Sequence, residues 1–134
     1  MISGLDHVAI PMENVDGMLA FYRSLGATII EEVPDFLHSA YLGRNKINLH
    51  MPKAWQSPKF ELRGPAAKPG CGDLCFVWGG SLNALQNMLA DAGAETVEGP
   101  VERNGGLNRM GTSIYTRDPD RNLLEFIVYD KPED

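Results

Sequence analysis

Four polar side chains interrupt apolar, strand-like segments of the sequence: His7, Asn48, Asp73 and Glu125. An imidazole and two carboxylates can coordinate a divalent metal and leave positions open for water or substrate. Two carboxylates crowded in a partly buried cleft repel each other, and without a cation one of them would take up a proton. The set therefore predicts a metal site, with His7, Asp73 and Glu125 as ligands and His50 as a further candidate ligand.

An internal repeat accounts for the placement of these residues. The segment Arg-Asn-Lys-Ile-Asn-Leu at 44–49 reappears as Arg-Asn-Leu-Leu-Glu-Phe at 121–126, 77 positions later, and an earlier Gly-Ala pair is repeated after 67 positions. A repeat of this length indicates two copies of one supersecondary unit packed together. The larger second offset predicts a Gly-rich loop at 99–111, whose Asn-Gly-Gly stretch at 104–106 is expected to be a mobile lid or rim.

The first copy is predicted to be a βαβββ module over residues 4–51. Asn14 or Asp16 caps the helix, which runs to Leu25 and is terminated by a glycine. The strands of this module are expected at 5–11, 27–33, 38–42 and 46–51.

The second copy is predicted at 71–130, after a proline-rich linker at 52–70. Ser81 caps its helix and Gly93 closes it. The strands are expected at 72–78, 96–97, 112–117 and 123–129. The two modules together predict one α+β domain over residues 1–134.

Strand parity places the polar residues on one face of each module. Side chains alternate along a strand, so His7 lies opposite to the apolar residues beside it, and Asn48 shares its face with His50. The repeat matches His7 with Asp73 and Asn48 with Glu125. These positions are expected to converge if the face is concave and left uncovered by the helices.

Other residues on or near these strands are candidates for substrate binding. Arg103 and Arg109 could anchor an anionic group, and Asn48, Cys75 and Tyr115 complete the set of predicted substrate contacts. Within the metal set, Glu125 and Asp73 are the candidates for a general base.

The composition limits the class of protein. The chain has 134 residues, 43% hydrophobic content and a net charge of −6, with 12 basic residues scattered along it. Nucleic-acid binding is not expected, because it needs clustered Lys and Arg. No apolar run reaches the roughly 20 residues of a membrane span, and no signal peptide is evident. The two cysteines, Cys71 and Cys75, are four positions apart on one expected strand, a spacing of about 13 Å that is too long for a disulfide. We therefore expect a reduced, cytoplasmic protein.

Several motifs resemble the vicinal oxygen chelate superfamily, which comprises glyoxalases, bleomycin-resistance proteins and extradiol dioxygenases. The similar motifs are Leu-Asp-His-Val at 5–8, Phe-Tyr at 21–22, Leu-Gly at 25–26 and Asp-Pro-Asp-Arg-Asn-Leu-Leu-Glu at 118–125. Within it, the segments at 46–50 (Lys-Ile-Asn-Leu-His), 73–76 (Asp-Leu-Cys-Phe) and 99–103 (Gly-Pro-Val-Glu-Arg) are similar to the glyoxalase-domain-containing branch.

This resemblance implies two βαβββ modules with a concave mixed sheet and one divalent metal, Zn, Ni, Mn or Fe. Carried over by position, it implicates His7, Asn48, Asp73 and Glu125. It further implies a homodimer, in which the modules pair within one chain or across a swapped dimer.

The resemblance favours a lyase or isomerase of the glyoxalase type, in which the metal stabilises an enediolate formed from a small α-oxygenated carbonyl substrate. A metal-free protein that sequesters a small molecule is the alternative. A ring-cleaving dioxygenase is a further one, although Asp73 stands where that class has a second histidine.

Overall fold

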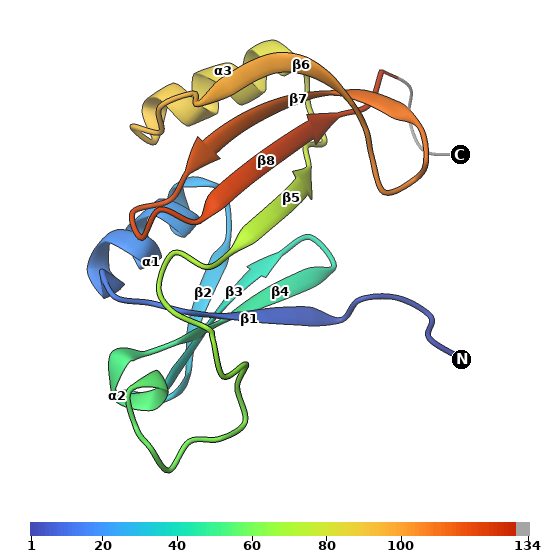
Figure 1. Ribbon diagram of the computed structural model, residues 1–134. Helices are drawn as coiled ribbons and strands as arrows, with labels where there is room; N and C mark the ends of the chain where they lie inside the picture. The colour runs from blue at the N-terminus through green and yellow to red at the C-terminus, as the bar shows by residue number, and fades with distance from the viewer. Residues whose placement is uncertain (131–134) are drawn as a thin grey trace. The chain divides into compact units, whose positions relative to one another are not determined.

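The computed structural model describes residues 1–130, which divide into two compact units, Met1–Cys71 and a second unit that begins at Gly72. Each unit contains a four-stranded mixed sheet and an α-helix of ten residues (Figure 1). No helix in the described part of the chain is both long and apolar enough to cross a bilayer.

The first unit has the predicted βαβββ order and one additional short helix. Its elements are β1 His7–Pro11, α1 Val15–Ser24, β2 Thr28–Val33, β3 Leu37–Leu42, β4 Asn45–His50 and α2 Pro52–Trp55. The strand order in the sheet is β1-β4-β3-β2, with β1 and β4 parallel and the other neighbours antiparallel.

The second unit repeats this topology. Its elements are β5 Asp73–Val77, α3 Leu82–Asp91, β6 Glu98–Asn104, β7 Met110–Arg117 and β8 Leu123–Val128. The strand order is β5-β8-β7-β6, and again only the first pair is parallel. The prediction of two equivalent α+β modules is confirmed.

The two ten-residue helices, α1 and α3, begin and end close to where their sequences predict. The Asn14 side chain accepts a hydrogen bond from the backbone N–H of Gly17, and the Ser81 hydroxyl accepts one from that of Ala84. Such caps satisfy N–H groups that have no partner within the helix. After each helix a glycine, Gly26 or Gly93, takes a positive φ of 96° or 70° and turns the chain into the next segment.

Alternation along the strands separates a buried face from a polar one. Buried apolar side chains include Ile10, Met18, Tyr22, Ile47 and Leu49 in the first unit, and Leu85, Leu89, Ile114, Leu124 and Phe126 in the second. Along β4 and β8 these residues alternate with Asn48 and Glu125, which therefore lie on the opposite face.

The sequence-based prediction was wrong for the segment before β7. A strand was expected at 96–97 and a loop at 99–111, but β6 occupies Glu98–Asn104 and pairs with β7. The strand accommodates Pro100 through a register shift between Glu98 and Val101, with Gly99 at a φ of 110°. In the stretch 104–106, which was expected to be a mobile lid or rim, Asn104 ends β6, and Gly105 and Gly106 begin the β6–β7 turn.

The predicted linker at 52–70 also has defined structure. It begins with α2, which has a proline at its start. Further along, the Phe60 ring packs edge-to-face against Phe36, with 4.8 Å between ring centroids. The segment is therefore packed onto the first unit.

Candidate functional site

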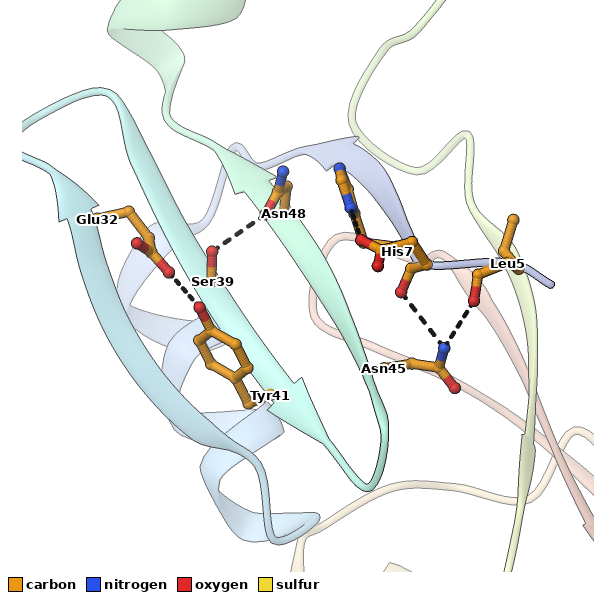
Figure 2. A network of polar contacts seen from close by, with 8 residues as sticks. Leu5, His7, Glu32, Ser39, Tyr41, Asn45 and Asn48 are labelled. Atoms are coloured by element: carbon orange, nitrogen blue, oxygen red, sulfur yellow. Dashed lines mark hydrogen bonds and ion pairs between the residues drawn. The ribbon is translucent and has the colours of Figure 1, made fainter. Parts of the chain in front are cut away.

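The polar face of the first unit centres on His7 and Asn48. Asn48 lies opposite Ala9 in the parallel β1–β4 register, so it is diagonal to His7, two residues further along. Strand spacing gives such a diagonal a length of about 8 Å between Cα atoms. Figure 2 shows both side chains on this part of the sheet.

His7 is oriented by the residue before it. Its Nδ1 lies 2.6 Å from the Oδ1 of Asp6. The hydrogen bond with His7, followed by the positive charge of the His7 ring, lowers the pKa of the Asp6 carboxyl below the usual value of 3.8. A carboxylate that accepts the Nδ1–H directs the Nε2 lone pair outward, which is the tautomer needed for metal binding.

Asn48 is held from the neighbouring strand. The Ser39 hydroxyl, which is completely buried, donates a 3.1 Å hydrogen bond to the Asn48 Oδ1 (Figure 2). One step further, the Tyr41 hydroxyl donates a 2.5 Å bond to Glu32 and thereby lowers the pKa of the Glu32 carboxyl. The polar face thus continues from β1 across β4 and β3 to β2.

His50 lies apart from His7 within this unit. It pairs with Pro11 in the register, four residues beyond the position of His7, or about 13 Å along the strand. Its ring packs edge-to-face on Phe60 at 5.2 Å. Burial, together with the charge of Arg63, lowers the pKa of His50 below 6.5.

The polar face of the second unit brings Asp73, Cys75 and Glu125 together. Cys75 lies directly opposite Glu125 in the β5–β8 register, and Asp73 is diagonal to it. The Ser113 hydroxyl, fully buried on β7, donates a 2.6 Å hydrogen bond to the Glu125 Oε2. This hydrogen bond fixes the direction of the Glu125 carboxyl group.

The two serines were missed by the sequence analysis. Ser39 lies on the strand beside Asn48, and Ser113 on the strand beside Glu125. Parity within β3 and β7 would have placed both on the polar face. Each was passed over because an isolated serine in a middle strand carries no motif.

An arginine and a tyrosine extend the second polar face. The Arg103 Nε donates a 3.1 Å hydrogen bond to the Tyr115 hydroxyl, and its Nη2 lies 3.8 Å from the Glu98 carboxylate. Tyr115 pairs with Glu125 in the register, so this cation is near the carboxylate. The bond to Tyr115 raises the pKa of Arg103, which stays charged.

Arg109 lies away from Tyr115 and Glu125. It precedes β7, and Tyr115 lies six residues further along the chain, which corresponds to about 20 Å of strand. Its guanidinium lies over the Tyr129 ring, 4.6 Å from the centroid.

The environment of Cys75 predicts an unreactive thiol. The residue as a whole is exposed, yet burial of its sulfur, followed by the charge of Glu125, raises the thiol pKa from 9.0 to about 12. Stability should accordingly fall as the pH rises above 9, because the folded state holds the proton more tightly than the unfolded state. With iodoacetamide at about pH 8, Cys75 should react about 30-fold more slowly than an ordinary thiol.

Peptide mapping of the alkylated protein tests this, with the exposed Cys71 as an internal control. Glu125→Gln should speed the reaction of Cys75, since it removes the negative charge. Equal labelling of both cysteines in the wild-type chain would contradict the raised pKa.

Each unit holds part of the predicted ligand set. The first carries His7 and His50, and the second carries Asp73 and Glu125. Among residues 1–130, no three His, Cys, Asp or Glu side chains are gathered into a group that could hold a metal ion.

Comparison with known proteins gives matches over nearly the whole chain. The family model of the glyoxalase/bleomycin resistance protein/dioxygenase superfamily matches residues 4–126. A glyoxalase domain-containing protein of Mycosarcoma maydis is 36% identical over 96% of this chain and 69% of its own length.

Solved structures agree with these matches. A virulence protein of Salmonella typhimurium is 33% identical, with a TM-score of 0.84 over 96% of this chain and 98% of its own. An integron cassette protein of V. cholerae is 32% identical, with a TM-score of 0.85 over 97% and 98%. Two more distant structures share the fold alone: a fosfomycin resistance protein of Listeria monocytogenes, at 19% identity and a TM-score of 0.64, and an antibiotic-binding protein of a Streptomyces species, at 17% and 0.72.

Proposed function

Because the chain belongs to the glyoxalase/bleomycin resistance protein/dioxygenase superfamily, we propose that it is a metal-dependent lyase or isomerase acting on a small α-oxygenated carbonyl compound. The observation that carries this proposal is the Ser113–Glu125 hydrogen bond of 2.6 Å, which orients a carboxylate in an otherwise apolar strand. A binding pocket without chemistry has no need of a carboxylate held in this way.

The donor set fits a divalent metal. His7 offers Nε2 because Asp6 engages its Nδ1, and Asp73 and Glu125 offer carboxylate oxygens. We propose that these three residues are the ligands, supplied by the two modules of one chain or by two chains of a homodimer. One imidazole with two carboxylates suits Zn, Ni, Mn or Fe.

When bound, the metal supplies Lewis-acid polarisation of two adjacent oxygens of the substrate. Glu125 is the proposed base that takes the proton from the carbon α to the carbonyl and returns it to the neighbouring carbon. The Ser113 hydroxyl fixes the direction of the Glu125 carboxylate.

The surrounding residues suggest how the substrate is held. Arg103, fixed by Tyr115 and Glu98, would hold an anionic group of the substrate near Glu125. The Asn48 amide, with its Oδ1 engaged by Ser39, would donate to a substrate oxygen. The Cys75 thiol, whose pKa is raised to about 12, would line the substrate site as a protonated, unreactive group.

Metal content of the purified protein tests the proposal. Protein prepared without chelator or affinity tag should contain about one equivalent of a divalent metal by elemental analysis. The His7→Ala, Glu125→Ala double variant should lose it, because two of three ligands are removed. Wild-type metal binding should then direct screening to α-hydroxycarbonyl and thiohemiacetal substrates.

If the wild-type protein contains no metal, even after loading with Mn, Fe, Ni and Zn, the lyase proposal is contradicted. That result would favour the alternative, a metal-free protein that sequesters a small molecule. Size-exclusion chromatography on the same preparation checks the predicted homodimer.

A further inference from the structure

A pocket lies within the first unit, in the segment that follows β4. It is formed by residues 55–65 and has a volume of about 420 Å³, with Trp55, Phe60, Glu61 and Arg63 in its lining. Pockets for small organic ligands typically measure roughly 300–1,000 Å³. The space is therefore sufficient for a compact ligand of about one aromatic ring.

The aromatic walls of this pocket are held in place from outside it. The Trp55 indole Nε1 donates a 2.8 Å hydrogen bond to the backbone carbonyl of Met12. Phe60 packs edge-to-face against both Phe36 and His50, at 4.8 and 5.2 Å between centroids. Walls that are already ordered do not have to be ordered by the ligand.

Arg63 gives the pocket a positive charge, and one terminal nitrogen of its guanidinium already has an acceptor. This nitrogen donates to the backbone carbonyl of Ala67. The Arg63 Nε is buried and has no hydrogen-bond partner among the residues that the structure describes. The Nε is closed off from the pocket, so a ligand would meet the terminal nitrogens of the guanidinium, and their positive charge favours an anion as the acceptor.

The charge of the segment points to an anion as that acceptor. Residues 52–70 contain four basic residues and one acidic residue, a net charge of +3 in a chain whose total is −6. The one acid, Glu61, lies in the lining but is exposed to solvent. Arg63 is half-buried, so solvent screens its attraction for a bound anion less than it screens the repulsion by Glu61.

We propose that this pocket binds a small aryl carboxylate, whose ring packs between Trp55 and Phe60 and whose carboxylate pairs with the guanidinium of Arg63. The proposal does not rest on the metal site, because none of these residues belongs to the proposed ligand set.

The probe is benzoate, compared with benzamide, which has the same shape without the charge. In a ¹H–¹⁵N NMR titration of the full-length wild-type chain, benzoate should shift the Trp55 indole N–H and the amides of residues 55–63. Binding in the millimolar range is expected for so small a ligand. Benzamide should bind at least tenfold more weakly, because a charge-assisted hydrogen bond contributes about 1.5–3 kcal/mol.

Arg63→Gln should weaken benzoate binding at least tenfold, whereas Lys59→Gln, which removes the same charge from the same segment but not from the pocket lining, should change it less than about twofold. The His7→Ala, Glu125→Ala variant should bind benzoate as the wild-type chain does. Equal binding of benzoate and benzamide, shifts that avoid residues 55–63, or no shift at about 10 mM benzoate would each overturn the proposal, whether or not the Arg63 variant folds.

Discussion

Replacing Asn122 by alanine is expected to lower the free energy of unfolding by about 3 kcal/mol. The Asn122 side chain is completely buried and joins two segments of the second unit. Its Oδ1 accepts a 2.7 Å hydrogen bond from the backbone N–H of Gly72, immediately before β5. Its Nδ2 donates a 2.7 Å bond to the Asp118 carboxylate, which is only 4% exposed.

The size of the effect follows from what the substitution leaves behind. Alanine removes a donor from a buried carboxylate and an acceptor from the Gly72 N–H. A hydrogen bond to a charged group contributes about 1.5–3 kcal/mol and a neutral one about 0.5–1.5 kcal/mol. Asp118 keeps its bonds from the backbone N–H groups of Asp120 and Asn122, so the loss should be partial.

Urea unfolding followed by circular dichroism measures this change. Asn104→Ala is the matched control, since the Asn104 side chain donates to that of an exposed residue, Asn108, and its loss should cost less than about 0.5 kcal/mol. A loss below about 1 kcal/mol for Asn122→Ala would show that these hydrogen bonds do not hold β5 to the start of β8.

Replacing Glu125 by glutamine is expected to weaken metal binding more than a hundredfold. The substitution keeps the size of the side chain but removes the negative charge that Ser113 orients. An amide oxygen is a weaker ligand than a carboxylate, and it cannot act as a base. Competition with a chelator of known affinity measures the loss, and turnover of any identified substrate should fall with it.

Ser113→Ala tests how much the orientation of the Glu125 carboxylate contributes to metal affinity, apart from its role as a ligand. It leaves the Glu125 carboxylate in place without its hydrogen bond, and changes of this kind next to metal ligands typically cost about 10–100-fold in metal affinity. Ser113→Thr, which keeps the hydroxyl, should restore part of the affinity.

Glu102→Gln is the control for charge alone. Glu102 neighbours Arg103 on β6 but is exposed and alternates to the opposite face of the strand. Metal affinity should change by less than about twofold. If Glu125→Gln binds metal as the wild-type chain does, Glu125 is not a ligand and the proposed chemistry fails.

The predicted elements were most accurate where local rules decide the structure. The caps at Asn14 and Ser81 and the glycines that follow each helix act within one turn of the chain. The strands that carry His7 and Glu125 were found because apolar residues alternate with polar ones over several positions.

The segment from Glu98 to Asn104 shows where local rules fail. Gly99 and Pro100 are typical of a loop, yet this segment pairs with β7 through a register shift. Only the partner strand supplies the hydrogen bonds that make it a strand. The packing of Phe60 on His50 likewise joins the apparent linker to the end of β4, ten positions earlier in the chain.

Periodicity along the chain predicted the two equivalent βαβββ modules and the polar face of each, with His7 and Asn48 in the first and Asp73 and Glu125 in the second, because strand and helix periodicity are local properties. Which side chains meet across strands depended on tertiary structure. The Ser113 bond to Glu125 and the Asn122 bond to Gly72 join residues 12 and 50 positions apart. Such contacts depend on strand register and chain reversal, which no local pattern encodes.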